Sequence, residues 1–238
     1  MSIIENESLI QQFFGNHKRL CMRFPDDCVK AIILAPHPDD ETIGCGGIIA
    51  KYNNIQMDMT SILATYKKDD MRGLEFINAM KLLNCKYQFI ELEDGKIEEQ
   101  KETLVTKIHY LIDVLCPDII FTPYLLDFNP DHRVLSTALS EITYSKKTLI
   151  AMYEVWTPIL YPNYYIDISK QNDKKNSAIQ SYQSQEMLYH LKNKAENLNG
   201  FRAELLMRKN VSAMEAFKVF DSVQFKKIVE LFKNIKLI

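Results

Sequence analysis

The sequence predicts an α/β protein with a mainly parallel sheet and helices on both of its faces. Between residues 30 and 143, short apolar segments alternate four times with segments of helical pattern, an order typical of parallel sheets. The apolar segments contain few polar residues, as expected of strands that are buried on both faces. A chain of 238 residues can bury one sizeable core, so we expect a single domain over residues 1–238.

The first strand is expected at residues 30–35, after a short leading helix at residues 6–14. The last five residues of this strand carry no polar side chain. Pro36 and Pro38 then end the strand, because proline has no backbone N–H to donate to a ladder. A helix at about residues 43–53 follows, so the first strand–helix unit is complete.

The next part of the chain repeats the same order of elements. A strand is expected at residues 57–64, a charged loop at 65–70 and then a helix to about residue 84. Apolar residues recur at helical spacing in this helix: Phe76, Met80 and Leu83. A short strand at residues 88–92 closes this unit.

A clear 3.6-residue period predicts the next helix. Its apolar stripe consists of Leu104, Ile108, Leu111 and Leu115. Pro117 ends this helix, and a further buried strand is expected at residues 118–122. After a loop at 123–130, a helix at about residues 132–143 completes the alternation.

The C-terminal part shows a different pattern. Strands are expected at residues 149–155 and 164–168, where they extend the sheet or form a hairpin-like lobe over the site. Residues 171–199 and 212–236 are expected to be mostly helical. The whole order of elements predicts a Rossmann-like α/β sandwich.

Composition and charge narrow the class of protein. The net charge of −2 and the pI near 6.2 give no reason to expect a nucleic-acid partner. Five cysteines without CxxC spacing suit reduced thiols in a cytoplasm better than a disulfide framework. The N-terminus lacks the basic and apolar regions of a signal peptide, and no apolar run approaches the roughly 20 residues that span a bilayer.

Ligand-type side chains follow the first strand immediately. His37, Asp39, Asp40 and Glu41 come at the carboxyl end of a strand expected in an open parallel sheet. Ligands of such sheets bind at that edge. The sequence therefore places a candidate site there.

A second group of such side chains follows the strand at residues 118–122. It includes Asp127, Asn129, Asp131 and His132. Two parallel strands would bring both groups to the same edge of the sheet, so that two imidazoles and one carboxylate form a three-ligand set.

The expected metal ligands are His37, Asp40 and His132. Three protein ligands leave an open coordination position for water, as catalytic zinc requires. Asp39 lies beside a ligand and is the candidate general base. Two histidines and a carboxylate also suit non-haem Fe(II), but oxygenases of that type use a closer His-x-Asp/Glu pair, so we favour Zn²⁺ or a similar divalent ion.

The chain resembles the PIG-L/LmbE-like deacetylases over most of its length. The matching segments are Ala35 to Glu41, Gly44 to Gly47, Arg72-x-x-Glu75, Asp94-Gly95 and Asp131-His132-Arg133, with weaker matches at Lys175-x-x-Ala178, Ser184-Gln185 and Glu215-x-Phe217. The family consists of zinc enzymes that remove acetyl from N-acetylglucosamine units. The resemblance implies an LmbE-like fold, the same three metal ligands, Asp39 as the base and Arg72 in contact with the sugar.

One position departs from the family pattern. The family usually has His-Pro-Asp-His in its second metal segment, and its first histidine helps stabilise the transition state. This chain has Asn129-Pro130-Asp131-His132. An asparagine can donate a hydrogen bond to an oxyanion but cannot carry a positive charge near neutral pH, so we assign Asn129 this catalytic role.

Other candidate residues have two possible roles each. Asp127 either orients a neighbour or closes a turn, and we include it among the substrate-binding candidates. Trp156 either forms a wall of a sugar pocket or packs in the core. Arg72 contacts substrate or forms an i, i+3 ion pair with Glu75 on a helix. Asp131 could be a further metal ligand, but we favour a helix N-cap or support for a ligand.

We therefore expect a metal-dependent de-N-acetylase whose partner is an N-acetylated sugar or sugar conjugate. A metal-dependent hydratase of a small oxo-acid could use the same ligands and base, and basic side chains around the substrate would favour it. A non-catalytic sugar-binding protein is a third possibility. The sequence also allows a homo-oligomer.

Overall fold

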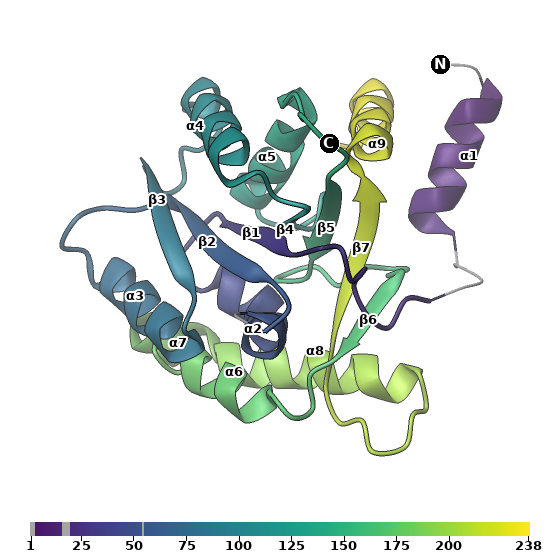
Figure 1. Ribbon diagram of the computed structural model, residues 1–238. Coiled ribbons are helices and arrows are strands. Elements are labelled where there is room, and N and C mark those ends of the chain that lie inside the picture. The colour runs from purple at the N-terminus through teal and green to yellow at the C-terminus, as the bar shows by residue number, and fades with distance from the viewer. Residues whose placement is uncertain (1–2, 16–19, 54) are drawn as a thin grey trace.

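The computed structural model describes residues 3–15, 20–53 and 55–238 (Figure 1). The strands of this part are β1 Lys30–Ala35, β2 Asp58–Thr65, β3 Lys86–Leu92, β4 Ile119–Pro123, β5 Leu149–Tyr153, β6 Tyr164–Asp167 and β7 Met214–Asp221. They form a seven-stranded sheet in the spatial order β3, β2, β1, β4, β5, β7, β6. The first five of these strands run parallel, and β7 is antiparallel to both β5 and β6.

Helices cover both faces of the sheet, as the sequence predicts (Figure 1). One layer contains α4 Lys101–Leu115, α5 Pro130–Ala138 and α9 Ser222–Asn234, and α1 Ile3–Phe14 packs against α9. The other layer contains α2 Asp40–Tyr52, α3 Met71–Leu83, α6 Asn172–Ile179, α7 Gln183–Tyr189 and α8 Leu191–Leu205. A 3₁₀ turn at Leu139–Glu141 follows α5. The mainly parallel α/β fold is therefore confirmed, and one continuous sheet is compatible with the single domain that we expect.

Each face of the sheet has its own apolar core. The side chains of β1 alternate between them, since Ile32 and Leu34 belong to one core while Ile33 and Ala35 belong to the other. All of these side chains are buried. The uninterrupted apolar run of β1 thus reflects a strand that is covered on both sides.

The parallel pairing of β1 with β4 positions the candidate site. Ile33 of β1 lies opposite Phe121 of β4 in this ladder. Both strands therefore end at the same edge of the sheet, where the chain continues into the first and second ligand segments. The predicted meeting of these two segments depends on this register.

The strand β7 is the main difference from the expected elements, because residues 212–236 were expected to be mostly helical. Only α9 is a helix within this range, and β7 lies between β5 and β6. Glu215 and Lys218 interrupt the apolar residues of β7 at a spacing of three, which resembles a helical pattern. Both charged side chains are nevertheless buried, because each has a polar partner inside the fold.

The other C-terminal expectations are met more closely. The predicted strand at 149–155 becomes β5 and extends the sheet, whereas the one at 164–168 becomes the edge strand β6. Residues 171–199 are largely helical.

The helix that was expected at about residues 43–53 is α2, which begins at Asp40 instead of residue 43. Its first turn contains two acidic residues, which are favourable at the positive end of a helix.

The buried carboxylate of Glu215 connects β7 to α2, the helix that carries Asp40 of the first ligand segment. Glu215 accepts hydrogen bonds from the backbone N–H groups of Gly47 (2.7 Å) and Ile48 (2.8 Å) in α2. It also accepts one from Nζ of Lys175 in α6 (2.7 Å), which in turn donates to Asn199 Oδ1 in α8 (2.8 Å). These bonds hold three helices and the central antiparallel strand in one arrangement.

None of the helices in the described residues combines the length and the apolarity needed to cross a membrane. All five cysteines are free thiols.

Gly47 of α2 packs against Ile168, the residue that follows β6. A Cβ at this position would lie 2.6 Å from Cδ1 of Ile168, which is too close for two carbon atoms. We expect Gly47→Ala to lower the free energy of unfolding by about 1–3 kcal/mol, the range for overpacking a core. Gly200→Ala is the matched control, because a Cβ at Gly200 of α8 would meet no atom within 4 Å.

The control should raise stability by up to about 1 kcal/mol, since alanine favours a helix more than glycine does. Urea unfolding followed by circular dichroism measures both changes. Equal midpoints for Gly47→Ala and the wild type would contradict the close packing of α2.

Candidate metal centre and active site

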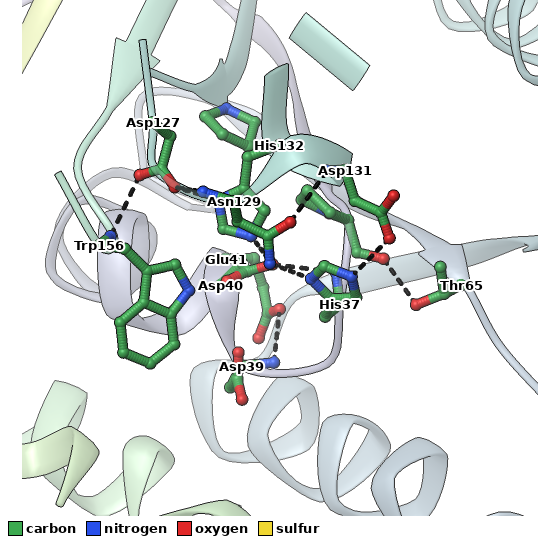
Figure 2. Close-up of polar contacts among 12 residues, drawn as sticks. His37, Asp39, Asp40, Glu41, Thr65, Asp127, Asn129, Asp131, His132 and Trp156 are labelled. Atoms are coloured by element: carbon green, nitrogen blue, oxygen red, sulfur yellow. Dashed lines mark hydrogen bonds and ion pairs between the residues drawn. The ribbon is translucent and has the colours of Figure 1, made fainter. Parts of the chain in front are cut away.

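Two ligand segments meet at the carboxyl ends of β1 and β4 (Figure 2). His37 belongs to the turn after β1, Asp40 is the first residue of α2, and His132 lies in the first turn of α5. Oδ2 of Asp40 lies 3.3 Å from Nδ1 of His37 and 3.1 Å from Nε2 of His132. One ligand atom from each of the three side chains lies within 4.8 Å of the other two, a spacing that could hold a metal ion.

The nature of these side chains fits a divalent cation. They are nearly or fully buried, with 6% of His37, 1% of Asp40 and none of His132 exposed. Neither ring nitrogen of His132 makes a well-formed hydrogen bond, although carboxylate oxygens lie near both. Buried polar atoms rarely lack a hydrogen-bond partner. A cation bound by both Asp40 and His132 would give Nε2 of His132 such a partner.

His37 is held from its other side by two further carboxylates. Its Nε2 lies 3.1 Å from Oδ2 of Asp131 and 3.2 Å from Oδ1 of Asp94. These three residues also lie close enough to hold a cation, but Asp94 is exposed. Carboxylates on the outer nitrogen of a histidine ligand typically fix its ring. We therefore regard His37, Asp40 and His132 as the inner set and Asp94 and Asp131 as their support.

The carboxylates control the charge of the two imidazoles. Burial lowers the pKa of His37, but hydrogen bonds with Asp131, Asp40 and Asp94 outweigh it and raise the pKa to about 12. Burial also opposes protonation of His132, yet the charge of Asp40 and the contact with Asp127 raise its pKa to about 9. A site that stabilises positive charge on both rings will also stabilise a divalent cation that replaces the protons.

The adjacent carboxylate of Asp39 has a different environment. Burial and the charge of Asp40 raise the pKa of Asp39 well above its usual value, although Arg72, 3.9 Å away, opposes this. The backbone of Asp39 has a φ of 120°, which is unfavourable for a residue with a side chain. Such strain is concentrated at functional sites, where surrounding contacts maintain it.

Glu41 provides part of this support, a role that no local sequence pattern indicates. It is fully buried, and its carboxylate accepts hydrogen bonds from the backbone N–H of Asp39 (3.3 Å), from Thr42 Oγ1 (2.6 Å) and from the hydroxyl of Tyr182. Burial raises the pKa of Glu41 to about 7, while Thr42 and Tyr182 lower it. Tyr182 lies 141 residues further along the chain, so local sequence patterns could not reveal the contact.

Asn129 is the N-cap of α5. Its Oδ1 accepts a hydrogen bond from the backbone N–H of Asp131 (2.9 Å), and its side chain lines a cavity above the inner set. With Oδ1 engaged by the helix, Nδ2 is the atom that remains for a ligand. The donor role of Asn129 stays a prediction.

Asp127 lies behind His132 and does not line the cavity. It is 1% exposed, and Oδ1 lies 3.3 Å from Nδ1 of His132. Its oxygens also accept hydrogen bonds from the backbone N–H groups of Trp156 and Thr157 (both 3.1 Å) and of Asn129 (2.9 Å). Of the two roles left open by the sequence, this placement favours orientation of a neighbour.

The cavity above the inner set has a volume of about 390 Å³. Three aromatic side chains line it, and Phe128 is 83% exposed at its rim. The ring of Trp156 meets that of Tyr189 edge to face, with centroids 5.9 Å apart. Asp39, Arg72 and Asn129 line the same cavity. Apolar rings together with a few polar groups are typical of a small-molecule site.

Arg72 points into the site instead of pairing with Glu75. It donates to Oδ2 of Asp94 (2.8 Å) and to the carbonyl of Pro38 (3.4 Å). Glu75 accepts from the backbone N–H (2.8 Å) and Oγ (2.7 Å) of Ser184. The two residues of the Arg-x-x-Glu motif therefore have separate functions, because Glu75 anchors α7 while Arg72 lines the cavity.

The fold and this site define an α/β protein with a buried His–Asp–His set, an adjacent carboxylate and a cavity above them. Residues 32–143 match the model of the PIG-L family, which is described as GlcNAc-PI de-N-acetylase. The matched range contains all three inner residues and Asp39. The resemblance to the PIG-L/LmbE-like deacetylases is therefore confirmed over this range.

Named relatives are similar over most of the chain. The probable N-acetyl-alpha-D-glucosaminyl L-malate deacetylase 2 of Bacillus subtilis is 26% identical over 195 residues, which cover 70% of this chain and 88% of that protein. The diacetylchitobiose deacetylase of Thermococcus kodakarensis is 25% identical over 194 residues, or 67% of this chain and 71% of that protein. The structure of N,N′-diacetylchitobiose deacetylase from Pyrococcus horikoshii has a TM-score of 0.72 at 20% identity and covers 94% of both chains, which shows the same fold.

If the inner set binds a metal, its histidines should control metal content. We expect about one zinc ion per chain in the wild type and a large loss in His37→Ala and in His132→Ala, since each removes one of three protein ligands. Elemental analysis after dialysis against excess zinc measures this. His109→Ala is the control, because His109 is half-buried on α4 and belongs to neither group of residues that could hold a metal ion. Full zinc content in both site variants would show that the ligand set is wrong.

Proposed function

We propose that this protein is a metal-dependent hydrolase that removes acetyl from the amino group of an N-acetylated sugar or sugar conjugate of the N-acetylglucosamine type. The observation that carries the proposal is the inner set of His37, Asp40 and His132 with Asp39 beside it at the base of a cavity. The deacetylases among the relatives support it.

Zinc is the metal that we propose. Two imidazoles and one carboxylate are a common set for catalytic zinc, and other divalent ions accept the same donors. Zinc bound there would supply Lewis-acid chemistry, since it would polarise an amide carbonyl and lower the pKa of a water molecule towards ~7. His37, Asp40 and His132 would hold the ion, while Asp131, Asp94 and Asp127 fix the two rings.

Asp39 moves the proton in the proposed reaction. Its carboxylate accepts a proton as the water oxygen attacks the acetyl carbon. The protonated Asp39 then gives this proton to the sugar nitrogen as the C–N bond breaks, which yields acetate and an amine. Its raised pKa suits both steps, because a carboxylate of ordinary pKa would be a weaker base and would hold the proton less well.

Asn129 stabilises the oxygen that becomes negative during the attack. A donor fixed near a developing oxyanion lowers the barrier more in a water-poor cavity than it would in bulk water. The N-cap bond to Asp131 holds the amide in place, so Nδ2 would not need to reorganise. Since this amide cannot supply a proton, Asp39 serves as both base and acid.

The cavity favours a sugar over an oxo-acid. Aromatic rings can stack on the apolar faces of a sugar, and Asp39 and Asp94 offer acceptors to hydroxyl groups. Arg72 is the cationic side chain among the described lining residues, and it is already paired with Asp94. Apart from the metal and its ligands, Asp39 and Asp94 line the cavity with Arg72 as their cationic neighbour, so a small oxo-acid finds few cationic partners there and the hydratase alternative has less support. Trp156 and Arg72 are the proposed substrate contacts.

We propose a cytoplasmic setting, in line with the five free thiols.

Release of acetate from N-acetylglucosamine derivatives in the presence of zinc tests the proposed function. Asp39→Asn should retain the metal but lower kcat by roughly a hundredfold or more, the scale of losing a general base. Asp113→Asn, an exposed position on α4, should behave like the wild type. An Asp39→Asn variant with normal kcat at matched zinc content would exclude Asp39 from the mechanism.

Asn129 needs a variant that separates its two roles. Asn129→Ser keeps a good N-cap residue but removes the amide donor, so stability and zinc content should stay while kcat falls by about a hundredfold, or ~3 kcal/mol. Asn129→His should restore a donor and add a limb near pH 6.5 to the pH–rate profile, because imidazole titrates there. Wild-type kinetics in Asn129→Ser would leave Asn129 with the capping role alone.

A further inference from the structure

The backbone of Asp39 is unusual for the residue that precedes a helix. Its φ is 120°, whereas Asn129 before α5 and Asp221 before α9 both have a φ of −73°. The side chains of those two residues accept a hydrogen bond from the first turn of their helices. Within residues 20–53, the side chain of Asp39 makes no such N-cap bond, although aspartate is among the best residues for it.

The carboxylate of Asp39 faces the cavity instead. Asp39 and Arg72 both line the cavity above the inner set, and Oδ2 of Asp39 lies 3.9 Å from Nη2 of Arg72. In an ordinary N-cap the carboxylate accepts a backbone N–H from the second or third helical residue, here Glu41 or Thr42. These two arrangements require different backbones at Asp39, so the capping role and the role of a base exclude each other.

The positive φ of Asp39 has to be maintained by its surroundings, because it is unfavourable for a residue with a side chain. Oε2 of Glu41 accepts a hydrogen bond from the backbone N–H of Asp39 at 3.3 Å (Figure 2). A glutamate reaches back to the N–H of the N-cap residue in the capping box too, although there it is the third helical residue and Glu41 is the second. Glu41 therefore holds the backbone of the N-cap residue while the side chain of Asp39 remains directed at the cavity.

Two hydroxyl groups fix the other oxygen of Glu41. Oε1 accepts hydrogen bonds from Oγ1 of Thr42 (2.6 Å) and from the hydroxyl of Tyr182, and these two hydroxyl oxygens are 3.3 Å apart. The side chains of Glu41, Thr42 and Tyr182 are fully buried. With Oε1 held in this way, Oε2 is directed at the N–H of Asp39. Tyr182 lies beyond residues 32–143, so this contact comes from outside the range that matches the family model.

We propose that Tyr182 is a positioning residue for the base Asp39 and acts through Glu41, an inference that rests on the proposed deacetylase function. The hydroxyl of Tyr182 orients the carboxylate of Glu41, which holds Asp39 at its positive φ. Asp39 thereby stays available to the reaction. Without this hydroxyl the backbone of Asp39 relaxes to that of an ordinary N-cap, and its carboxylate turns from the cavity to the helix.

Tyr182→Phe removes the hydroxyl but keeps the buried ring. The substrate is N-acetylglucosamine or N,N′-diacetylchitobiose, whichever the wild type hydrolyses faster. We expect kcat for acetate release to fall at least about tenfold, since a displacement of about 1 Å in a reacting group can cost about a hundredfold. KM and zinc content should stay unchanged, because Tyr182 belongs neither to the cavity lining nor to the inner set.

Tyr144→Phe is the matched control. It removes a tyrosine hydroxyl that donates to the backbone carbonyl of Leu139 (2.8 Å), and Tyr144 does not line the cavity. Its kcat should equal that of the wild type. Thr42→Val removes the second donor to Oε1 of Glu41 and should lower kcat in the same direction as Tyr182→Phe, so the inference can be tested even if one of these variants fails to fold.

A double-mutant cycle separates a positioning role from a general loss of structure. In the Asp39→Asn background, Tyr182→Phe should lower kcat no further, because the base that Tyr182 positions is already absent. A structural defect would lower kcat by the same factor in both backgrounds.

The backbone of Asp39 provides a readout that does not depend on activity. In a crystal structure of Tyr182→Phe, φ of Asp39 should be negative and its carboxylate should accept a backbone N–H of Glu41 or Thr42. In Tyr144→Phe, φ should stay positive.

An unchanged kcat in Tyr182→Phe, equal effects in both backgrounds or a retained positive φ would each overturn the positioning role and leave the deacetylase function intact. Absence of acetate release from every N-acetylglucosamine derivative by the wild type would instead overturn the proposed function. The φ of Asp39 in Tyr182→Phe would still show whether Tyr182 holds this backbone.

Discussion

The ladder between β1 and β4 determines the geometry of the candidate site, because each strand delivers one half of it. Ile33 and Phe121 lie side by side in this ladder, and four residues beyond Ile33 the chain reaches His37. A shift of one residue in this register would turn every side chain of β1 to the opposite face of the sheet. The two separate apolar cores, which take alternate side chains of β1, prevent that shift. Packing in the cores therefore fixes the distance between the two ligand segments.

The same edge of the sheet concentrates an unusual amount of buried negative charge. Asp39, Asp40 and Glu41 are consecutive and buried, and Asp127 and Asp131 face them from the next segment. Such a cluster is costly unless cations or protons balance it. The pKa values of the two imidazoles and of the carboxyl groups of Asp39 and Glu41 are raised, so all four groups favour their protonated forms. A divalent ion in the inner set would supply positive charge in place of these protons. Metal binding is therefore linked to the stability of this part of the fold.

Local patterns predicted the strands and the ligand segments well, because both depend on residues that are close in the sequence. The apolar run of β1 and the acidic residues after it required no knowledge of distant contacts. The strand β7 was missed because its charged residues Glu215 and Lys218 are stabilised by partners on other elements. The strained backbone of Asp39 and the bond between Glu41 and Tyr182 were likewise out of reach, since long-range contacts maintain them.

The helix α7 differs from the elements around it, because none of its residues is buried although it carries Gln185 and Tyr189 on the cavity wall. Its attachment consists largely of the bonds from Ser184 to Glu75 and from the preceding Tyr182 to Glu41. The residues of α7 after Ser184 are half-buried or exposed, so they can change with little cost to either core. Evolution could therefore alter which ligands the protein accepts by varying one surface helix, while selection on the folded core and on the inner set continues unchanged.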